Sequence, residues 1–124
     1  MPEMLVDSVI LIDHFNGAGQ ATQFILDADP ESLVISVITR AEILVGFPED
    51  KLDDVKALLN QYKTLGIDKH IADKAAALRR EHGWKLPDAF QAALSIANKI
   101  PLITRNTKDF DPGRHPFVHI PYQI

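Results

Sequence analysis

One short segment, residues 4–13 (MLVDSVILID), limits the possible fold more than any other part of the chain. A short apolar run ends at Asp7, and an apolar stretch of helical length follows at once. This pattern is typical of a buried parallel strand that passes directly into a helix. Open α/β sheets bind their ligands beyond the carboxyl ends of such strands. The segment therefore predicts that a central strand places Asp7 at the functional edge of a sheet.

The rest of the chain alternates in the same way. The β-branched run at 33–37 is the strongest strand prediction, and we expect further strands at 66–68, 101–104 and 117–120. Apolar spacings of three and four predict helices at about 7–15, 20–28, 39–45, 49–63, 68–81 and 88–98. Such alternation indicates a single domain over residues 1–124. We expect an α/β fold, a three-layer α/β/α sandwich with a central, mainly parallel sheet of 4–5 strands.

Amino-acid composition limits the cellular compartment in which the protein is expected and the kind of partner that it binds. The absence of cysteine excludes disulfides and thiolate metal sites and favours a reducing compartment. We see no signal peptide and no stretch long enough to span a membrane, so we expect a cytoplasmic protein. Residues 1–68 carry 4 Lys/Arg and 12 Asp/Glu, whereas residues 69–124 carry 9 and 5. This asymmetry indicates an anionic partner, although solvated helix faces of unequal charge explain it as well.

Carboxylates recur where predicted strands end. Taken singly, each has a structural explanation. Asp7 suits a helix N-cap, Thr39 and Glu42 form a capping-box pattern, and Asp88 complements a helix dipole. The loop after the strand at 101–104 adds three side chains that commonly form turns, Asn106, Asp109 and Asp111, and Phe110 there is expected to anchor the loop to the core.

The coincidence of these acids carries the functional prediction. Carboxylates gathered at one edge repel one another unless a cation lies between them. Oxygen ligands without cysteine favour Mg²⁺ or Mn²⁺, and such a site can promote hydrolysis of phosphodiester bonds. The five histidines show no zinc-binding spacing, and no glycine-rich phosphate loop is present. Ser8 either supports the metal through water or caps the helix.

Four pieces of the sequence together resemble the PIN-domain ribonucleases, and among them the VapC-type toxins of toxin–antitoxin pairs. In chain order they are Val6-Asp7-Ser8 with Leu11-Ile12-Asp13, residues 36–46 (SVITRAEILVG), residues 86–89 (LPDA) with Ala92-Ala93, and residues 102–110 (LITRNTKDF). They span nearly the whole chain. The resemblance implies a PIN-like parallel α/β/α sandwich and an endoribonuclease that uses Mg²⁺ or Mn²⁺.

The resemblance also implies the roles of individual residues. Asp7 and Asp88 are expected as direct metal ligands, with Glu42 acting through metal or water to orient the attacking hydroxide. The family's fourth acid often follows the Thr-Arg pair, where this chain has Asn106, so either Asn106 contributes a neutral oxygen or Asp109 takes the catalytic role. We therefore predict one well-bound ion and a weak second. Val9 stands where many members carry Ser or Asn.

Substrate and partners follow from the same resemblance. RNA is the expected substrate, with Ser8, Arg105, Asn106 and Lys108 as substrate-binding residues. The expected partners are an antitoxin, whose C-terminal segment fills the groove, and a second copy of the chain, in a homodimer or in a dimer of toxin–antitoxin heterodimers. We interpret Asp13 as structural, bonded to Arg40 or to a neighbouring subunit. The alternatives are an RNase H-like or flap-type DNA nuclease, a receiver domain and a non-catalytic binding module.

Overall fold

The centre of the fold is a five-stranded sheet in which every pairing is parallel. The computed structural model describes residues 2–123. The sheet order is β3-β2-β1-β4-β5. The strands are β1 (Met4–Val6), β2 (Leu33–Ser36), β3 (Lys63–Leu65), β4 (Leu102–Ile103) and β5 (Val118–His119). The predicted parallel α/β sheet is therefore confirmed.

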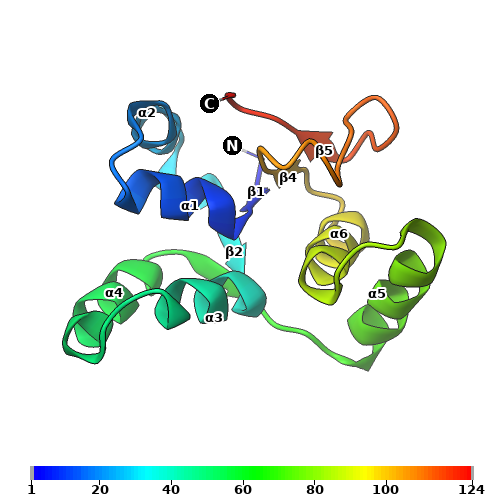
Figure 1. Cartoon of the computed structure of the whole chain (residues 1–124), viewed down its shortest axis with the longest axis horizontal. Helices are drawn as coiled ribbons and strands as arrows, with labels where there is room; N and C mark the ends of the chain where they lie inside the picture. Colours follow the sequence, from blue (N-terminus) through cyan, green and yellow to red (C-terminus); the bar gives the residue numbers. More distant parts are fainter. Residues whose placement is uncertain (1, 124) are drawn as a thin grey trace.

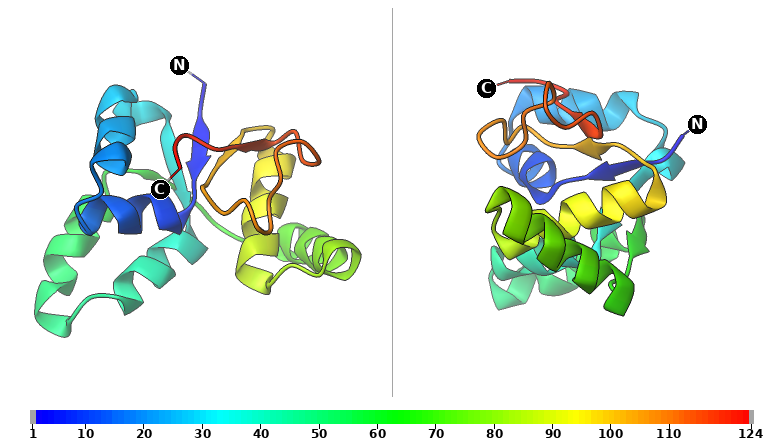
Figure 2. Two further views of the ribbon diagram at one scale, coloured as in Figure 1. Left: turned by 45° about the horizontal axis from the view of Figure 1, so that its top comes forward. Right: turned by 90° about the vertical axis from the view of Figure 1, so that its right-hand side faces the viewer.

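Helices cover both faces of this sheet, which confirms the predicted sandwich. The helices are α1 (Ser8–Phe15), α2 (Gly19–Asp27), α3 (Val37–Val45), α4 (Leu52–Leu59), α5 (Lys69–His82) and α6 (Leu86–Asn98), with short 3₁₀ turns at Pro30–Ser32 and Glu49–Lys51. Figures 1 and 2 show α5 and α6 together on one side of the sheet, and α1 to α4 on the other. No helix within residues 2–123 has the length and apolar character needed to cross a membrane.

Alternation along each strand divides the core between the two faces. Leu5, Val34 and Leu102 pack in one cluster with α5 and α6. Their neighbours, Val6, Ile35 and Ile103, pack in a second cluster with α1, α3 and α4. Successive side chains of a strand point to opposite faces, and here both faces are covered by helices. This is why the strands are continuously apolar in sequence.

Two boundary predictions are wrong, and the edge strand explains both. The helix predicted over 49–63 is a 3₁₀ turn followed by α4, which ends at Leu59. The strand expected at 66–68 lies instead at Lys63–Leu65, where it pairs with β2. Lys63 and Thr64 are exposed, because β3 is the last strand of the sheet. An exposed edge strand does not need the apolar residues by which the inner strands were recognised.

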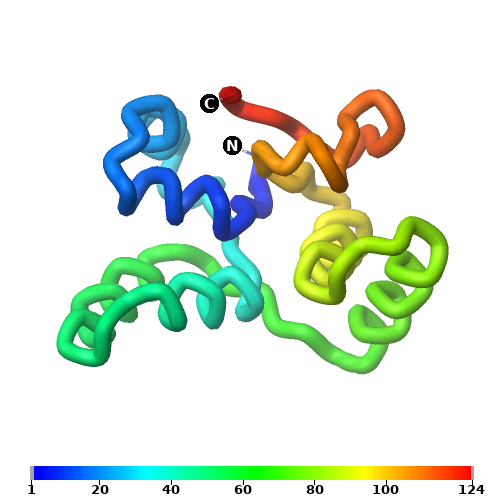
Figure 3. Tube along the Cα trace, viewed as in Figure 1, coloured from blue at the N-terminus to red at the C-terminus, as the bar shows by residue number. Residues whose placement is uncertain are grey.

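The order of the strands creates a switch point beside Asp7. The chain builds β1, β2 and β3 outward in one direction and then crosses, through α5 and α6, to the other side of β1. The trace in Figure 3 shows this crossing from the α3/α4 side to α5. The carboxyl ends of β1 and β4 therefore lie next to each other, with connections leaving in opposite directions. A cleft at this position is the usual ligand site of such sheets.

Candidate metal-binding active site

A pocket of about 380 Å³, here called the acidic pocket, opens at this switch point. It is lined by three carboxylates, Asp7, Glu42 and Asp88. They come from the end of β1, from α3 and from the start of α6. The other lining residues are Ser8, Val9, Arg105, Asn106, Thr107 and Lys108. Residues separated by more than 80 positions in the sequence thus meet in one pocket, at the edge where the strand-to-helix junctions predicted them.

Asp7 is held by three hydrogen bonds and is only 6% exposed. Its Oδ1 accepts from the Ser8 backbone N–H at 2.9 Å and from Gln91 Nε2 at 3.1 Å. Its Oδ2 accepts from Thr104 Oγ1 at 2.8 Å. Asp7 is the N-cap of α1, as expected from its place after the strand. The cap and the neighbouring donors fix the carboxylate in position, so the structural role and a ligand role are compatible.

Gln91, which the sequence did not identify as a site residue, contacts Asp7 directly. It is 1% exposed, and its Nε2 also donates to Thr39 Oγ1 at 2.7 Å. Its Oε1 accepts from Ser36 Oγ at 2.7 Å. Both ends of the amide are therefore committed, which orients its N–H toward Asp7. The signal in the sequence was an amide side chain within an alanine-rich, largely buried helix, one turn beyond Asp88.

The capping-box prediction for Glu42 is wrong. Ser36, not Thr39, caps α3, because its Oγ accepts from the Thr39 backbone N–H at 3.1 Å. Glu42 thus lies in the second turn, too far along the helix to reach the cap, and its Oε1 accepts from Ser8 Oγ at 3.0 Å. Burial and, to a smaller extent, the charge of Asp7 raise the pKa of Glu42, whereas the bond from Ser8 lowers it.

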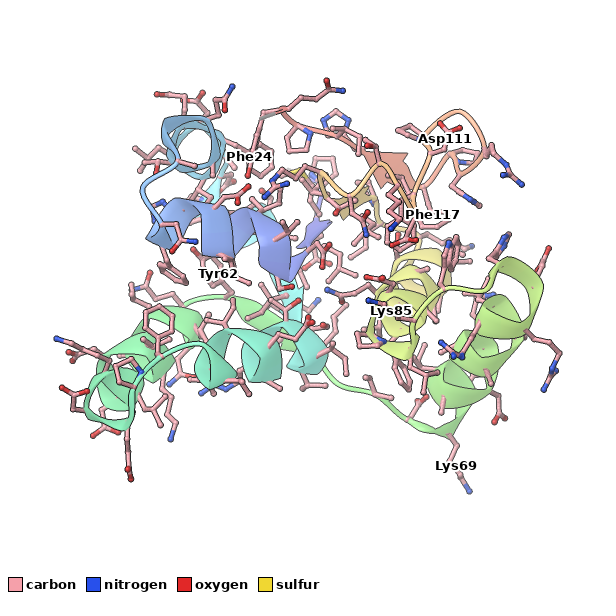
Figure 4. All side chains as sticks on the ribbon, viewed as in Figure 1. Phe24, Tyr62, Lys69, Lys85, Asp111 and Phe117 are labelled. Atoms are coloured by element: carbon pink, nitrogen blue, oxygen red, sulfur yellow. The ribbon has the colours of Figure 1, made fainter. Side chains whose placement is uncertain are left out.

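Asp88 shows the strongest electrostatic effect in the pocket. Burial raises its pKa from 3.8 to about 6, with further contributions from the negative charges of Asp7, Asp109 and Glu42. Lys85, at the N-cap of α6, acts in the opposite direction. Figure 4 shows Lys85 beside the start of this helix. A carboxylate crowded by others becomes easier to ionise when a cation enters, because the cation reverses the local potential.

The donor set fits a hard divalent ion that retains water. Asp7, Glu42 and Asp88 offer only oxygen ligands in an open, polar pocket. Within residues 2–123, no three Asp, Glu or His side chains converge into a preformed cation cage. Mg²⁺ and Mn²⁺ suit such a site, since Mg²⁺ usually binds through one or two carboxylates and fills its remaining positions with water or substrate oxygens.

The loop between β4 and β5 places Asn106 and Asp109 differently. Asn106 lines the acidic pocket, whereas Asp109 lines an adjoining one. The two side chains are linked, because Asn106 Nδ2 donates to Asp109 Oδ2 at 3.1 Å and the Asp109 backbone N–H donates to Asn106 Oδ1 at 3.3 Å. The buried Phe110 anchors this loop, as expected. Asp111 forms a turn by accepting from the Gly113 backbone N–H.

Asp13 forms an ion pair within the chain, although not with the expected Arg40. Its carboxylate accepts from Arg105 Nε at 2.5 Å and from Arg105 Nη2 at 2.9 Å, and Tyr122 Oη donates to it at 2.8 Å. Arg40 instead donates to Asn60 Oδ1 at 2.9 Å. The Asp13 cluster ties α1 to the loop after β4 and to the C-terminal segment. Arg105 therefore lines the acidic pocket while its ion pair with Asp13 fixes its guanidinium group.

We expect Asp13→Asn to destabilise the protein by about 1–2 kcal/mol at pH 7, since it leaves Arg105 without its partner. The hydrogen bond from Arg105 lowers the pKa of Asp13 below 3.8. The stabilisation is therefore present above about pH 4 and disappears as the pH falls through the folded-state pKa. Urea unfolding at pH 7 and pH 3 checks this, with the exposed Asp53→Asn as control. An equal effect of Asp13→Asn at both pH values would contradict it.

An apolar groove of about 260 Å³ adjoins the acidic pocket on the side of α1 and α3. Phe15 and Phe47 meet edge to face there, with ring centroids 5.5 Å apart. Ile12 and Ile43 complete its apolar lining, and Glu42 lines both this groove and the acidic pocket. Ile12 is 39% exposed, so its side chain is accessible from the groove. A groove of this kind suits a peptide with apolar anchors.

Comparisons with known proteins agree with this architecture. A chain in a toxin–antitoxin complex from Klebsiella pneumoniae is 37% identical, with a TM-score of 0.90 and coverage of 98% of this chain and 100% of that one. FitAcB from Neisseria gonorrhoeae is 19% identical (TM-score 0.79; coverage 98% and 99%), and VapBC2 from Rickettsia felis, bound to a promoter DNA fragment, is 19% identical (0.72; 93% and 94%). These last two likenesses concern the fold. No match was found among curated proteins.

A family model decides the classification. The model of the PIN domain matches residues 4–112, which include β1, all six helices, β4 and every carboxylate of the acidic pocket. Neither an RNase H-like protein nor a receiver domain accounts for this match. The chain belongs to the PIN domain family.

Proposed function

We propose that this protein is a metal-dependent endoribonuclease and the toxin of a VapBC-type toxin–antitoxin pair, acting in the cytoplasm. The observation that carries the proposal is the convergence of Asp7, Glu42 and Asp88 in one pocket. Burial, together with the negative charges of Asp7, Asp109 and Glu42, raises the pKa of Asp88 there to about 6. Membership of the PIN domain family supports a nuclease. The similarity to a chain of the Klebsiella pneumoniae toxin–antitoxin complex supports the toxin role.

In the proposed site, Asp7 and Asp88 hold Mg²⁺ or Mn²⁺ directly, and Glu42 contributes directly or through water. When bound, the ion supplies the Lewis acidity needed for phosphodiester hydrolysis. Gln91 and Thr104 keep Asp7 oriented before any ion arrives, because their donors already occupy fixed positions on its carboxylate. Such pre-orientation lowers the cost of binding, as the ligand does not have to be ordered at that moment.

The protein's own groups position the reactants. Ser8 holds Glu42 through Oε1, which leaves Oε2 to orient the attacking water and accept its proton. The raised pKa of Glu42 makes it a better base than an exposed carboxylate. Lys108, Asn106 and Arg105 line the other side of the pocket and bind the substrate phosphate. Asp109 acts through Asn106, whose amide it orients.

We propose that the antitoxin binds in the apolar groove. A segment bound along Ile12, Phe15 and Phe47 reaches Glu42 and thereby closes the acidic pocket to RNA. Phe47→Ala should weaken a complex with the cognate antitoxin while RNA cleavage by the free protein continues. The expected second copy of the chain stays a prediction, which the mass of the complex in light scattering checks.

The decisive experiment is cleavage of total RNA and of a matched single-stranded DNA with Mg²⁺, Mn²⁺ or EDTA. We expect RNA cleavage with either ion and none in EDTA, restored by added metal. Preferred cleavage of DNA would favour the flap-type alternative. Metal binding without cleavage of either strand would favour a binding module. A growth defect on expression, relieved by co-expression of a small protein encoded next to this one, tests the toxin role separately.

A further inference from the structure

A second polar pocket, of about 260 Å³, adjoins the acidic one and has a different chemistry. It lies between the C-terminal end of α5 and the β4–β5 loop. Its cationic and imidazole groups are Lys108, Arg114, His82 and His115, and Lys108 also lines the acidic pocket. We call this second pocket the basic pocket. Because Lys108 lines both pockets, a molecule bound in the acidic pocket can extend past Lys108 into the basic pocket.

The two cations of the basic pocket are not neutralised within the chain. Lys108 and Arg114 are exposed, and neither has a carboxylate oxygen within 4.0 Å among the residues that the structure describes. The carboxylates nearby have other contacts. Asp109 Oδ2 accepts from Asn106, and Glu81 approaches His82 with 3.8 Å between Oε2 and Nε2. Lys108 and Arg114 are therefore available to an anion.

Aromatic packing holds the two imidazoles in place. His82 stacks on Trp84 with centroids 4.2 Å apart and planes inclined by 20°. His115 meets both rings from the edge, at 5.1 Å from each. The loop that carries His115 is fixed by a hydrogen bond from Trp84 Nε1 to the Asp109 carbonyl, at 2.9 Å. Neither ring forms a hydrogen bond with another part of residues 2–123, so each can present an N–H to a ligand.

We propose that the basic pocket binds a phosphodiester group of the single-stranded RNA substrate, on one side of the bond that is cleaved. This rests on the proposed function and extends it to the path of the strand. An ammonium, a guanidinium and two imidazoles match the several oxygens of a phosphate. A base is a poorer match, because Trp84 is 5% exposed beneath His82 and offers it no free face.

The apolar groove, which shares Glu42 with the acidic pocket, differs from the basic pocket in its chemistry. It continues from Glu42, without Lys or Arg in its lining. The RNA strand therefore leaves the acidic pocket over Lys108 and toward Arg114, while the apolar groove remains for a protein segment. Three of the nine Lys and Arg residues in 69–124, namely Arg105, Lys108 and Arg114, line this path.

The test is the affinity of Arg114→Gln for a single-stranded oligoribonucleotide, measured by fluorescence anisotropy in EDTA, so that no cleavage is needed. Arg114 is exposed, and its replacement leaves the aromatic packing intact. We expect affinity to fall about tenfold and the dependence of log affinity on log salt to become less steep by roughly 0.7. Lys69→Gln removes the same charge at the far end of α5 (Figure 4) and should change neither quantity.

A second variant, His115→Gln, keeps a donor in the pocket but shifts its position, and should weaken binding by a smaller factor. Unchanged affinity in both Arg114→Gln and His115→Gln would overturn the basic pocket as an RNA site. So would an equal loss in Lys69→Gln, because that indicates only the general charge. Failure of the wild type to cleave RNA with metal would contradict the proposed function instead, and the binding measurement is independent of it.

Discussion

Asp88→Asn and Asp7→Asn should each lower metal-dependent RNA cleavage by about 10²–10³-fold. Asparagine keeps the shape and one oxygen of the side chain but removes the negative charge that attracts a divalent ion. Asp7 is also fixed by Gln91 and Thr104, so its replacement disturbs a proposed ligand that the fold already orients. The measurement is the initial rate on a labelled oligoribonucleotide with Mg²⁺ or Mn²⁺. Asp73→Asn, an exposed position on α5, is the matched control.

The free energy of unfolding of Asp88→Asn shows whether its loss of RNA cleavage comes from misfolding. Asp88 has a folded-state pKa of about 6 and an ordinary value of 3.8, so the native state binds more protons between these pH values. The metal-free wild type therefore loses stability as the pH rises from about 4 to about 6, by about 1 kcal/mol once solvent screening of this half-buried group is considered. Asp88→Asn removes that loss and should unfold at equal or higher urea at pH 8. Wild-type rates in both Asp7→Asn and Asp88→Asn would show that the acidic pocket is not the active site.

Phe110→Ala should destabilise the protein by about 3–5 kcal/mol, the largest effect we expect from a single substitution. Phe110 is fully buried, and its ring lies 4.9 Å from that of Trp84 and 6.4 Å from that of Phe117. Removing the ring leaves a cavity where the β4–β5 loop meets α6 and β5. Because Asn106 and Lys108 belong to the same loop, metal affinity and RNA binding should fall with stability.

Urea unfolding followed by the fluorescence of Trp84 measures this effect directly, since the only tryptophan lies against Phe110. Phe110→Leu is the control, because it fills most of the space and should cost far less. A loss below about 1 kcal/mol in Phe110→Ala would mean that the loop is held by other contacts. Unchanged RNA binding in a strongly destabilised variant would mean that the loop does not position Asn106 and Lys108.

Asp7 shows how a structural role and a proposed functional role are compatible in one residue. Its position after a buried strand predicts a helix cap, and it is the N-cap of α1. The same position places it at the carboxyl edge of the sheet, where Glu42 and Asp88 line the pocket with it. Each acid was ambiguous alone, and the proposal of a shared site is supported by the strand order, which brings the three junctions together.

Local predictions failed where two local patterns competed. Ser36 and Thr39 are both able to cap a helix, and the sequence favoured the pair Thr39 and Glu42. In the structure Ser36 caps α3, and Glu42 turns to Ser8 on another helix. Because α3 begins at Val37, Glu42 lies in the second turn, beyond reach of the cap, and is available for the tertiary contact with Ser8. The edge strand β3 escaped recognition for a related reason, since it has few apolar residues to bury.

The alternation of strands and helices, the burial of both sheet faces and the placement of acids at one edge were all predictable from the amino-acid sequence. These follow from periodicity and from the strand-to-helix junctions, which are local properties of the chain. Three features became visible only in the folded chain: Gln91 orients Asp7, Asp13 pairs with Arg105, and Asn106 rather than Asp109 lines the acidic pocket. The physical reason is directionality. A hydrogen bond joining residues 84 or 92 positions apart depends on the final placement of both side chains, which no local pattern contains.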